Sequence, residues 1–255
     1  MEAIKRELLA QFAQGQAFCR MRYQGQNYIL PVAVDNSLQL EDLLEIERQK
    51  TAVMENLQRF MQDKPYNHML LWGARGTGKS SLIRAAFQTL AGQGLKLLQL
   101  ACDDLQDLAF LLWVLAQTQD KFLIYIDDLS FSDNDDSYRA LKAVLDGSIA
   151  GMAKNVMLCV TSNRRHLLSE SHHSDDAIHP EEDVEEQISL AERFGLRLSF
   201  HPLSQRQYLD MVTHWALRHG LTYDDSLQQQ ALQFSLARGS RSARVAEQFV
   251  RQIGQ

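Results

Sequence analysis

The sequence has few cysteines and no long apolar run, and both absences narrow the class of protein. Its three cysteines, Cys19, Cys102 and Cys159, show no Cys-x-x-Cys spacing. This scattering is typical of buried thiols in a reducing compartment and argues against a disulfide framework. No apolar run approaches the ~20 residues that a membrane helix needs. The charged N-terminal residues also lack the apolar centre of a signal peptide. We therefore expect a cytoplasmic protein without a membrane partner.

Composition marks no specialised class either. The 255 residues are 45% hydrophobic and 23% charged, which is ordinary for a globular protein that builds a sizeable core. This length allows one large domain, or one domain with a smaller one attached. The net charge of −6 argues against a general nucleic-acid coat protein, although it leaves a local basic patch open. We find no internal repeat, no low-complexity tract, and no helix-turn-helix or zinc motif for DNA.

One short stretch carries the strongest functional signal. Residues 73–80 read Gly-Ala-Arg-Gly-Thr-Gly-Lys-Ser and fit the phosphate-binding pattern G-x-x-x-x-G-K-[ST]. Its glycines let the backbone bend so that successive N–H groups point at phosphate oxygens. The helix that follows adds the positive end of its dipole. An apolar run over 69–72 and an apolar helix face after Ser80 supply the strand–loop–helix context that the pattern requires.

The pattern predicts how this phosphate-binding loop holds a nucleoside triphosphate, which the resemblance described below implies is ATP. Lys79 is expected to reach the β- and γ-phosphates, and the Ser80 hydroxyl is expected to ligate Mg²⁺. The other expected contacts of the loop with ATP are Gly73, Ala74, Arg75, Gly76, Thr77, Gly78 and Ser81. The alternative is a glycine-rich turn with a solvated lysine, and the flanking strand and helix argue against it.

Two further apolar runs of strand length end in polar side chains. Residues 122–126 lead into Asp127 and Asp128. The first carboxylate is expected to hold Mg²⁺, and the second is placed to polarise the attacking water. Residues 156–160 lead toward Asn163, whose amide can orient that water. The alternative for Asn163 is a residue that begins a turn.

Strands and helices are predicted to alternate, which indicates a parallel sheet with helices on both faces. The strands are expected at 68–72, 95–100, 122–126, 156–160 and 196–200, and helices at 204–219, 226–237 and 241–253 then form a small all-helical domain. Residues 1–15 are expected to form a helix, and residues 17–34 are expected to form a β-hairpin that turns at Gly25. Arg20 and Arg22 are assigned to the solvent-exposed face of this hairpin.

Two arginines are candidates for contact with the γ-phosphate. Arg193 lies just before the last predicted strand and is expected to stabilise transition-state charge from a neighbouring subunit. Arg244 opens the last helix and is expected to reach the γ-phosphate of its own subunit, with Arg241 as its rival. The alternative for any lone arginine is a surface ion pair.

In this order the residues resemble those of an AAA+ ATPase. The phosphate-binding loop is similar to its Walker A motif, Asp127 and Asp128 to Walker B, and Asn163 to sensor 1. Arg193 is similar to the arginine finger and Arg244 to sensor 2. Longer runs resemble one bacterial branch, the domain-of-unknown-function family 815: these are residues 40–44, 70–81, 127–131, 161–167 and 188–195. The resemblance covers roughly residues 38–253.

The resemblance implies an α/β fold, a three-layer P-loop sandwich with strand order 5-1-4-3-2 and a helical lid. The expected division is an accessory segment at 1–37, a nucleotide-binding core at 38–203 and the lid at 204–255. It implies Mg-dependent ATP hydrolysis that is coupled to lid and subunit motion in a homo-oligomer, acting on an unknown protein or nucleic-acid client. Leu44, Ile46 and Gln49 would contact the adenine.

Two residues depart from the family pattern, and one region argues against a particular function. Asp128 stands where AAA+ proteins usually carry glutamate, and the shorter side chain predicts slow hydrolysis. Glu45 stands where they often carry glycine. The region after the second predicted strand, 101–106, is acidic and lacks an aromatic residue, which argues against polypeptide threading.

Two alternative functions remain open at this stage. One is an ATP-gated binding module with negligible turnover, and the other is a P-loop kinase that acts on a small acceptor. The helical lid and Arg193 disfavour the kinase. A polar loop at 164–183 is rich in His and Asp, but it lacks the spacing of a structural zinc site, and we assign it no metal.

Overall fold

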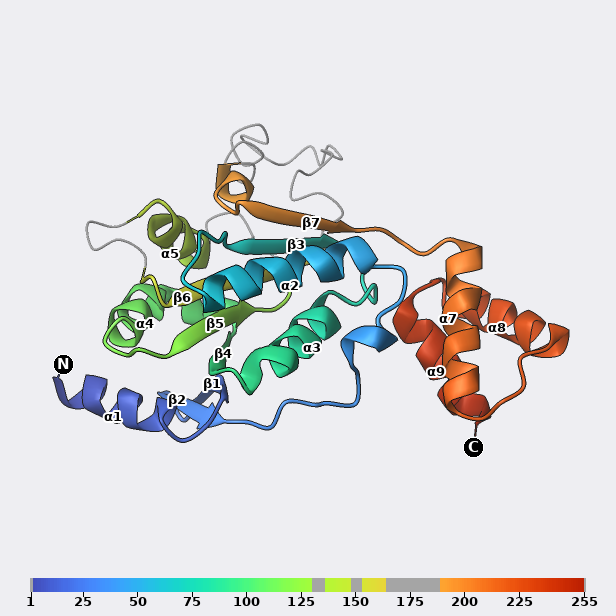
Figure 1. The fold of residues 1–255 in the computed structure, drawn as a ribbon, viewed down its shortest axis with the longest axis horizontal. Coiled ribbons are helices and arrows are strands. Elements are labelled where there is room, and N and C mark those ends of the chain that lie inside the picture. Colours follow the sequence, from blue (N-terminus) through green and yellow to red (C-terminus); the bar gives the residue numbers. More distant parts are fainter. Residues whose placement is uncertain (1, 130–135, 148–152, 164–188, 255) are drawn as a thin grey trace.

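The computed structural model describes residues 2–129, 136–147, 153–163 and 189–254. It contains a twisted sheet with helices on both faces and a helical bundle beside one end of it (Figure 1). The strands are β1 (Ala17–Tyr23), β2 (Gln26–Pro31), β3 (Met69–Gly73), β4 (Leu95–Leu100), β5 (Lys121–Ile126), β6 (Val156–Ser162) and β7 (Leu196–Phe200). The α-helices are α1 (Glu2–Phe12), α2 (Glu47–Met61), α3 (Lys79–Ala91), α4 (Leu108–Leu115), α5 (Asp136–Leu145), α7 (Gln205–Arg218), α8 (Asp225–Ala237) and α9 (Ala243–Ile253). Short 3₁₀ turns lie at η1 (Leu40–Asp42) and η2 (Cys102–Asp107).

The sheet contains the expected core and two additional strands. Its order is β2-β1-β4-β5-β6-β3-β7. When the five strands from β3 onward are numbered along the chain, they read 5-1-4-3-2, and all of them are parallel to their neighbours. The hairpin extends this sheet at the β4 edge, because β1 pairs in parallel with β4 and β2 pairs antiparallel with β1. The sequence did not predict this extension.

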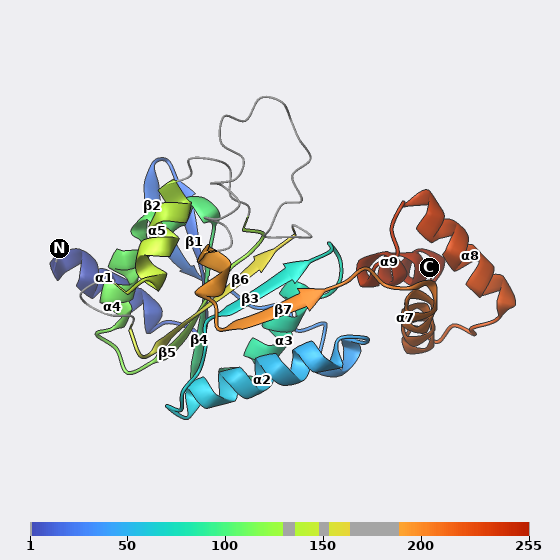
Figure 2. The same ribbon diagram turned by 90° about the horizontal axis from the view of Figure 1, so that it is seen from above.

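Helices bury both faces of the sheet (Figure 2). On one face, α2 and α3 pack on side chains such as Leu71 and Leu123. On the other face, α1, α4 and α5 pack on side chains such as Ile124 and Leu158. Burial on both faces explains why the central strands β5 and β6 are continuous apolar runs rather than alternating ones. Within the described part of the chain, no helix is long and apolar enough to cross a membrane.

The prediction that Arg20 faces solvent is wrong. Only 8% of Arg20 is exposed, and its Nε lies 3.4 Å from the Asp104 carboxylate. A second nitrogen of the same guanidinium binds Asp107. The reason is the pairing of β1 with β4, because η2 directly follows β4 and brings both carboxylates over the hairpin. Arg22 is exposed, as predicted.

The C-terminal bundle has the three helices that the sequence predicts, to within a few residues. Each begins at a side chain that caps its free N–H groups: Ser204 for α7, Asp224 for α8 and Ser242 for α9. Their apolar faces meet around Tyr208 and Phe249. Residues 189–192, which precede β7, are also helical. The polar loop at 164–183 lies outside the described residues.

Candidate functional site

The phosphate-binding loop curves tightly between β3 and α3. Its three glycines all have positive φ, at 127° for Gly73, 72° for Gly76 and 97° for Gly78. Two of them also allow close packing. A Cβ on Gly73 would lie 2.0 Å from the carbonyl oxygen of Phe200, and a Cβ on Gly76 would lie 2.8 Å from the Ser242 hydroxyl. The loop is therefore in contact with both the end of β7 and the first turn of α9.

Lys79 lies inside this loop and is only 5% exposed. Its ammonium donates to the carbonyl oxygens of Gly73 and Ala74, at 2.9 and 2.8 Å, and to Asn163 Oδ1 at 3.0 Å. Burial lowers the pKa of Lys79 to about 8, although the nearby carboxylates of Asp128 and Asp127 oppose this shift. The three oxygens that the ammonium binds are all neutral, and the charged oxygens of a phosphate could replace them.

The Asp127 carboxylate lies beside the first turn of α3. Its Oδ1 accepts hydrogen bonds from Ser80 Oγ at 3.0 Å, Tyr125 Oη at 2.6 Å and Thr161 Oγ1 at 2.7 Å. Burial acts to raise the pKa of Asp127, but these hydrogen bonds outweigh it, and the net pKa is lowered. A hydroxyl and an ionised carboxylate are the oxygen ligands that Mg²⁺ prefers, so Ser80 and Asp127 fit this ion.

Asp128 occupies the next position in a left-handed backbone conformation, with φ of 53°. Its backbone N–H donates to Thr161 Oγ1 at 3.0 Å. Its carboxylate accepts from Asn163 Nδ2 at 2.6 Å and lies 3.8 Å from the Arg75 guanidinium. About half of the side chain is exposed. The geometry presents a carboxylate to solvent beside the loop, as a general base requires.

These groups line one cavity of about 560 Å³ between the core and the helical bundle. The core side contributes the loop, both aspartates and Asn163. The bundle side contributes Arg244, Met211 and Trp215. Arg244 is in close contact with the loop, since its Cβ lies 3.5 Å from where a Cβ on Gly76 would be.

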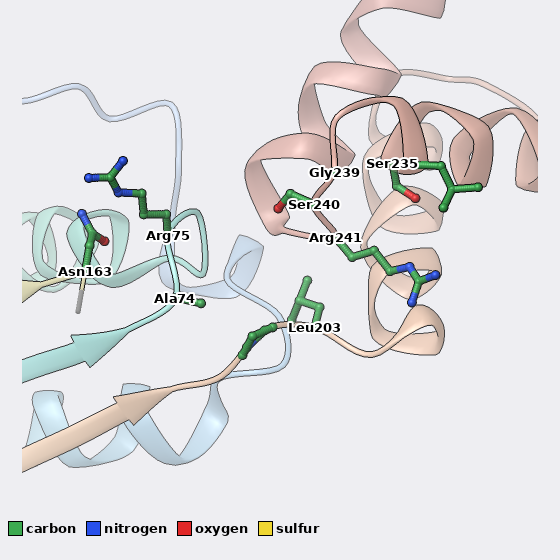
Figure 3. A pocket seen from close by; sticks show the side chains of 10 residues that line it. Ala74, Arg75, Asn163, Leu203, Ser235, Gly239, Ser240 and Arg241 are labelled. Carbon is green, nitrogen blue, oxygen red and sulfur yellow. The ribbon is translucent and has the colours of Figure 1, made fainter. Parts of the chain in front are cut away.

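Arg241, the rival of Arg244, lines a second cavity of about 630 Å³. Figure 3 shows Arg75 and Asn163 on the sheet side of this cavity, and Arg241 on the bundle side with its side chain directed away from Arg75. The two cavities adjoin at Arg75 and Asn163, which line both. The structure thus brings Arg244, and not Arg241, into the cavity that contains Lys79.

The residues predicted to contact adenine separate into two groups. Leu44 and Ile46 line the cavity that contains Lys79. Gln49 is not among its lining residues and donates from Nε2 to the carbonyl oxygen of Ser199 at 2.9 Å. Glu45, between the first two, has φ of 65°, which is a conformation that glycine adopts without strain. Its carboxylate accepts from Gln207 Nε2 of the helical bundle at 2.8 Å.

Arg193 lines neither of these two cavities. Its Nε binds the carboxylate of Asp146, and its Nη1 lies 2.6 Å from the Ser189 hydroxyl. The ion pair with Asp146 is the main cause that raises the pKa of this guanidinium. In its own subunit Arg193 is therefore tied to the end of α5 and does not join Lys79.

Sequence reasoning missed several residues of the site. Tyr125 was detectable, because it lies two positions before Asp127 on a strand and so faces the same side of the sheet. Thr161 became visible only once β6 was known to lie next to β5. Met211 and Trp215 come from α7, more than a hundred residues after the loop, and no local pattern connects them to it.

Comparisons with known proteins give one family and one fold. The family model described as "Protein of unknown function (DUF815)" matches residues 14–255. No curated protein matches the chain.

Among solved structures, replication initiator DnaA bound to AMPPCP and single-stranded DNA aligns with a TM-score of 0.62, at 15% identity over 87% of this chain and 66% of that chain. The Aeropyrum pernix ORC1 protein in complex with DNA aligns at 0.57, with 16% identity over 88% of this chain and 62% of that chain. The FIGL-1 AAA domain in complex with ADP aligns at 0.51, with 15% identity over 87% and 86%. The chain thus spans slightly under two thirds of the length of the first two. At these identities the similarity shows the fold.

Proposed function

The chain belongs to the DUF815 family and has an AAA+ P-loop fold, and from this premise we propose that it binds ATP with magnesium and hydrolyses it. One observation carries the proposal. Lys79, Ser80, Asp127, Asp128 and Asn163 come from three separate segments and line a single cavity at the carboxyl ends of parallel strands. Ligands in open α/β sheets bind at this edge.

In the proposed reaction, each of these groups has a separate task. The loop N–H groups and Lys79 bind the β- and γ-phosphates. Ser80 and Asp127 would hold magnesium, which when bound offsets phosphate charge. Asp128 accepts the proton of the attacking water, and Asn163 keeps that carboxylate in place through the hydrogen bond from its amide. Arg244 adds positive charge from the lid.

We further propose that the nucleotide couples the core to the helical bundle, which acts as a lid. Both parts line the cavity, so a bound nucleotide contacts both. The Gln207–Glu45 hydrogen bond and the Arg218–Asp42 ion pair also join α7 to the segment before α2. A change of nucleotide would therefore alter the angle between core and lid.

The proposed assembly is a homo-oligomer in which Arg193 acts on the neighbouring subunit. Arg193 does not line the cavity of its own subunit and binds Asp146 instead, which supports a role in trans. The client is a protein or a nucleic acid. Two of the solved structures with this fold contain DNA, which makes nucleic acid a client class to be tested here.

A second candidate is an ATP switch with negligible turnover. Asp128 has a shorter side chain than glutamate, and its carboxylate is already engaged by Asn163 and Arg75. Both features would leave the attacking water poorly activated. A switch of this kind would bind ATP as tightly as the proposed ATPase, but it would show no sustained release of phosphate.

Phosphate release under multiple turnover decides between the two. We expect sustained release from the wild-type protein and none from Lys79→Ala, because the variant lacks the cation that binds the transferring phosphoryl group. Lys64→Ala is the matched control, since Lys64 is an exposed lysine beyond the end of α2. Tight ATP binding without turnover would favour the switch, and absence of both would reject the proposed function.

A further inference from the structure

We propose that Tyr125 and Thr161 are positioning residues that hold the Asp127 carboxylate by one oxygen and so leave its other oxygen available to a magnesium ion. The pair is called the hydroxyl clamp below. This inference rests on the proposed function and names two residues that act on its metal site. The sequence analysis assigned neither residue a role in the site.

The clamp acts on one oxygen only. Oδ1 of Asp127 accepts the hydroxyls of Tyr125 at 2.6 Å and Thr161 at 2.7 Å, and Ser80 shares the same atom at 3.0 Å. Within the described part of the chain, these are the side chains that donate to this carboxylate, and all three bind Oδ1 rather than Oδ2. Rotation of the carboxylate would break both short bonds, so the orientation of Oδ2 is fixed. When Ser80 becomes a metal ligand, Tyr125 and Thr161 remain as anchors.

Each clamp hydroxyl can only donate to Asp127. Thr161 Oγ1 accepts the N–H of Asp128 at 3.0 Å, which leaves its single proton for Asp127. Tyr125 is 3% exposed, and its phenol O–H lies 2.6 Å from Asp127 Oδ1, to which it donates its single proton. Donation from both sides stabilises the ionised carboxylate, which is the form that binds a metal ion.

The fold places the clamp through strand register. Tyr125 and Asp127 are two residues apart at the end of β5 and so lie on one face of the sheet. Ile126 is paired with Val160 on the neighbouring strand β6, which brings Thr161 alongside Asp127. Because Thr161 also accepts the N–H of Asp128, it fixes the left-handed backbone of that residue. One hydroxyl thus sets both carboxylates of the site.

Magnesium-dependent nucleotide affinity tests the clamp without relying on turnover. The affinity for AMPPCP is measured by calorimetry over a range of Mg²⁺ concentrations and in EDTA. For Tyr125→Phe and Thr161→Val we expect the Mg²⁺ concentration at half-maximal gain in affinity to rise roughly 10-fold, as for other residues that orient metal ligands. The affinity in EDTA should stay unchanged, since the loop and Lys79 are intact.

Two further variants act as controls. Thr161→Ser keeps the hydroxyl and should restore the wild-type dependence on Mg²⁺. Tyr66→Phe removes a phenol that donates to the Val156 carbonyl oxygen at 3.1 Å, away from the cavity, and should change nothing. If Tyr125→Phe fails to fold, the comparison of Thr161→Val with Thr161→Ser decides the question.

Each outcome has one reading. An unchanged Mg²⁺ dependence in both clamp variants overturns the inference and leaves the proposed function standing. Equal weakening with Mg²⁺ and in EDTA also overturns it, because the hydroxyls would then support the site as a whole. A wild-type protein that does not bind AMPPCP under any of these conditions rejects the proposed function itself, and the clamp with it.

Discussion

His68 is a buried titratable residue whose role is structural. Its Nδ1 accepts the N–H of Leu158 at 3.1 Å, so the ring joins the start of β3 to β6. Burial lowers the pKa of this imidazole from 6.5 to about 4. At neutral pH the ring is therefore uncharged, as an acceptor at Nδ1 must be.

Acid should destabilise the protein through His68. The folded pKa lies below the unfolded one, so the stabilisation is complete above pH 6.5 and is lost as the pH falls toward 4. Between pH 7 and pH 4.5 the expected loss in the free energy of unfolding is about 2 kcal/mol. Urea denaturation at pH 7 and pH 4.5 measures it. His68→Asn should show a smaller loss, whereas His219→Asn, at an exposed histidine, should behave as wild type.

Lys79 should make ATP binding depend on pH in the alkaline range. Its pKa of about 8 means that a growing fraction is neutral above this pH, while bound phosphates favour the charged form. ATP binding should then take up a proton, and the affinity should fall up to about 10-fold per pH unit above pH 8. Calorimetry in buffers of different ionisation enthalpy detects the uptake. An affinity that is constant from pH 7 to pH 9.5 would contradict this account.

At the scale of elements, the contact between the phosphate-binding loop and α9 is the most specific feature. Ser242 caps α9 through a hydrogen bond from the Val245 N–H at 3.3 Å, and the same hydroxyl lies against Gly76. The first turn of α9 is therefore packed directly on the loop. Any side chain at residue 76 would separate the two.

Gly76→Ala should weaken ATP binding more than its strain alone explains. The residue has φ of 72°, and its new Cβ would meet Ser242 at 2.8 Å. Gly94→Ala is the matched control, because Gly94 has φ of 94° but open space around it. Both variants should lose about 1–2 kcal/mol of stability from left-handed strain. In calorimetry, only Gly76→Ala should also lose ATP affinity, and equal affinities would show that the contact is unimportant.

At the scale of the whole molecule, the two arginines that were predicted to contact phosphate lie in different places. Arg244 lines the cavity from the helical bundle, whereas Arg193 does not line it and binds Asp146. If the arginine acts at all on phosphate, it must act on another copy of the chain. Turnover should then depend on assembly.

Arg193→Ala should keep the ATP affinity of the wild type and lose most of its turnover, at least about 10³-fold if the residue acts as an arginine finger. The turnover per subunit of the wild type should rise with protein concentration, in parallel with the mass measured by light scattering. Arg197→Ala, at an exposed arginine on β7, is the control. Unchanged turnover in Arg193→Ala would remove this assignment.

The sequence by itself determined the elements whose signals are local. The glycine pattern at 73–80 specifies a bent loop, apolar runs specify buried strands, and the three C-terminal helices begin within two residues of their predicted starts. Each of these signals lies within a few residues of the structure it produces, because backbone conformation and burial pattern are set at that range.

Only the tertiary structure decided which side chains meet. Arg20 is buried because β1 joins β4, Thr161 reaches Asp127 because β6 lies beside β5, and Gln49 and Arg193 have partners at Ser199 and Asp146. Parallel strands are joined through long crossovers, so their neighbours come from distant parts of the chain. The partners of a side chain at the sheet edge therefore depend on strand order and register, which no short stretch of sequence contains.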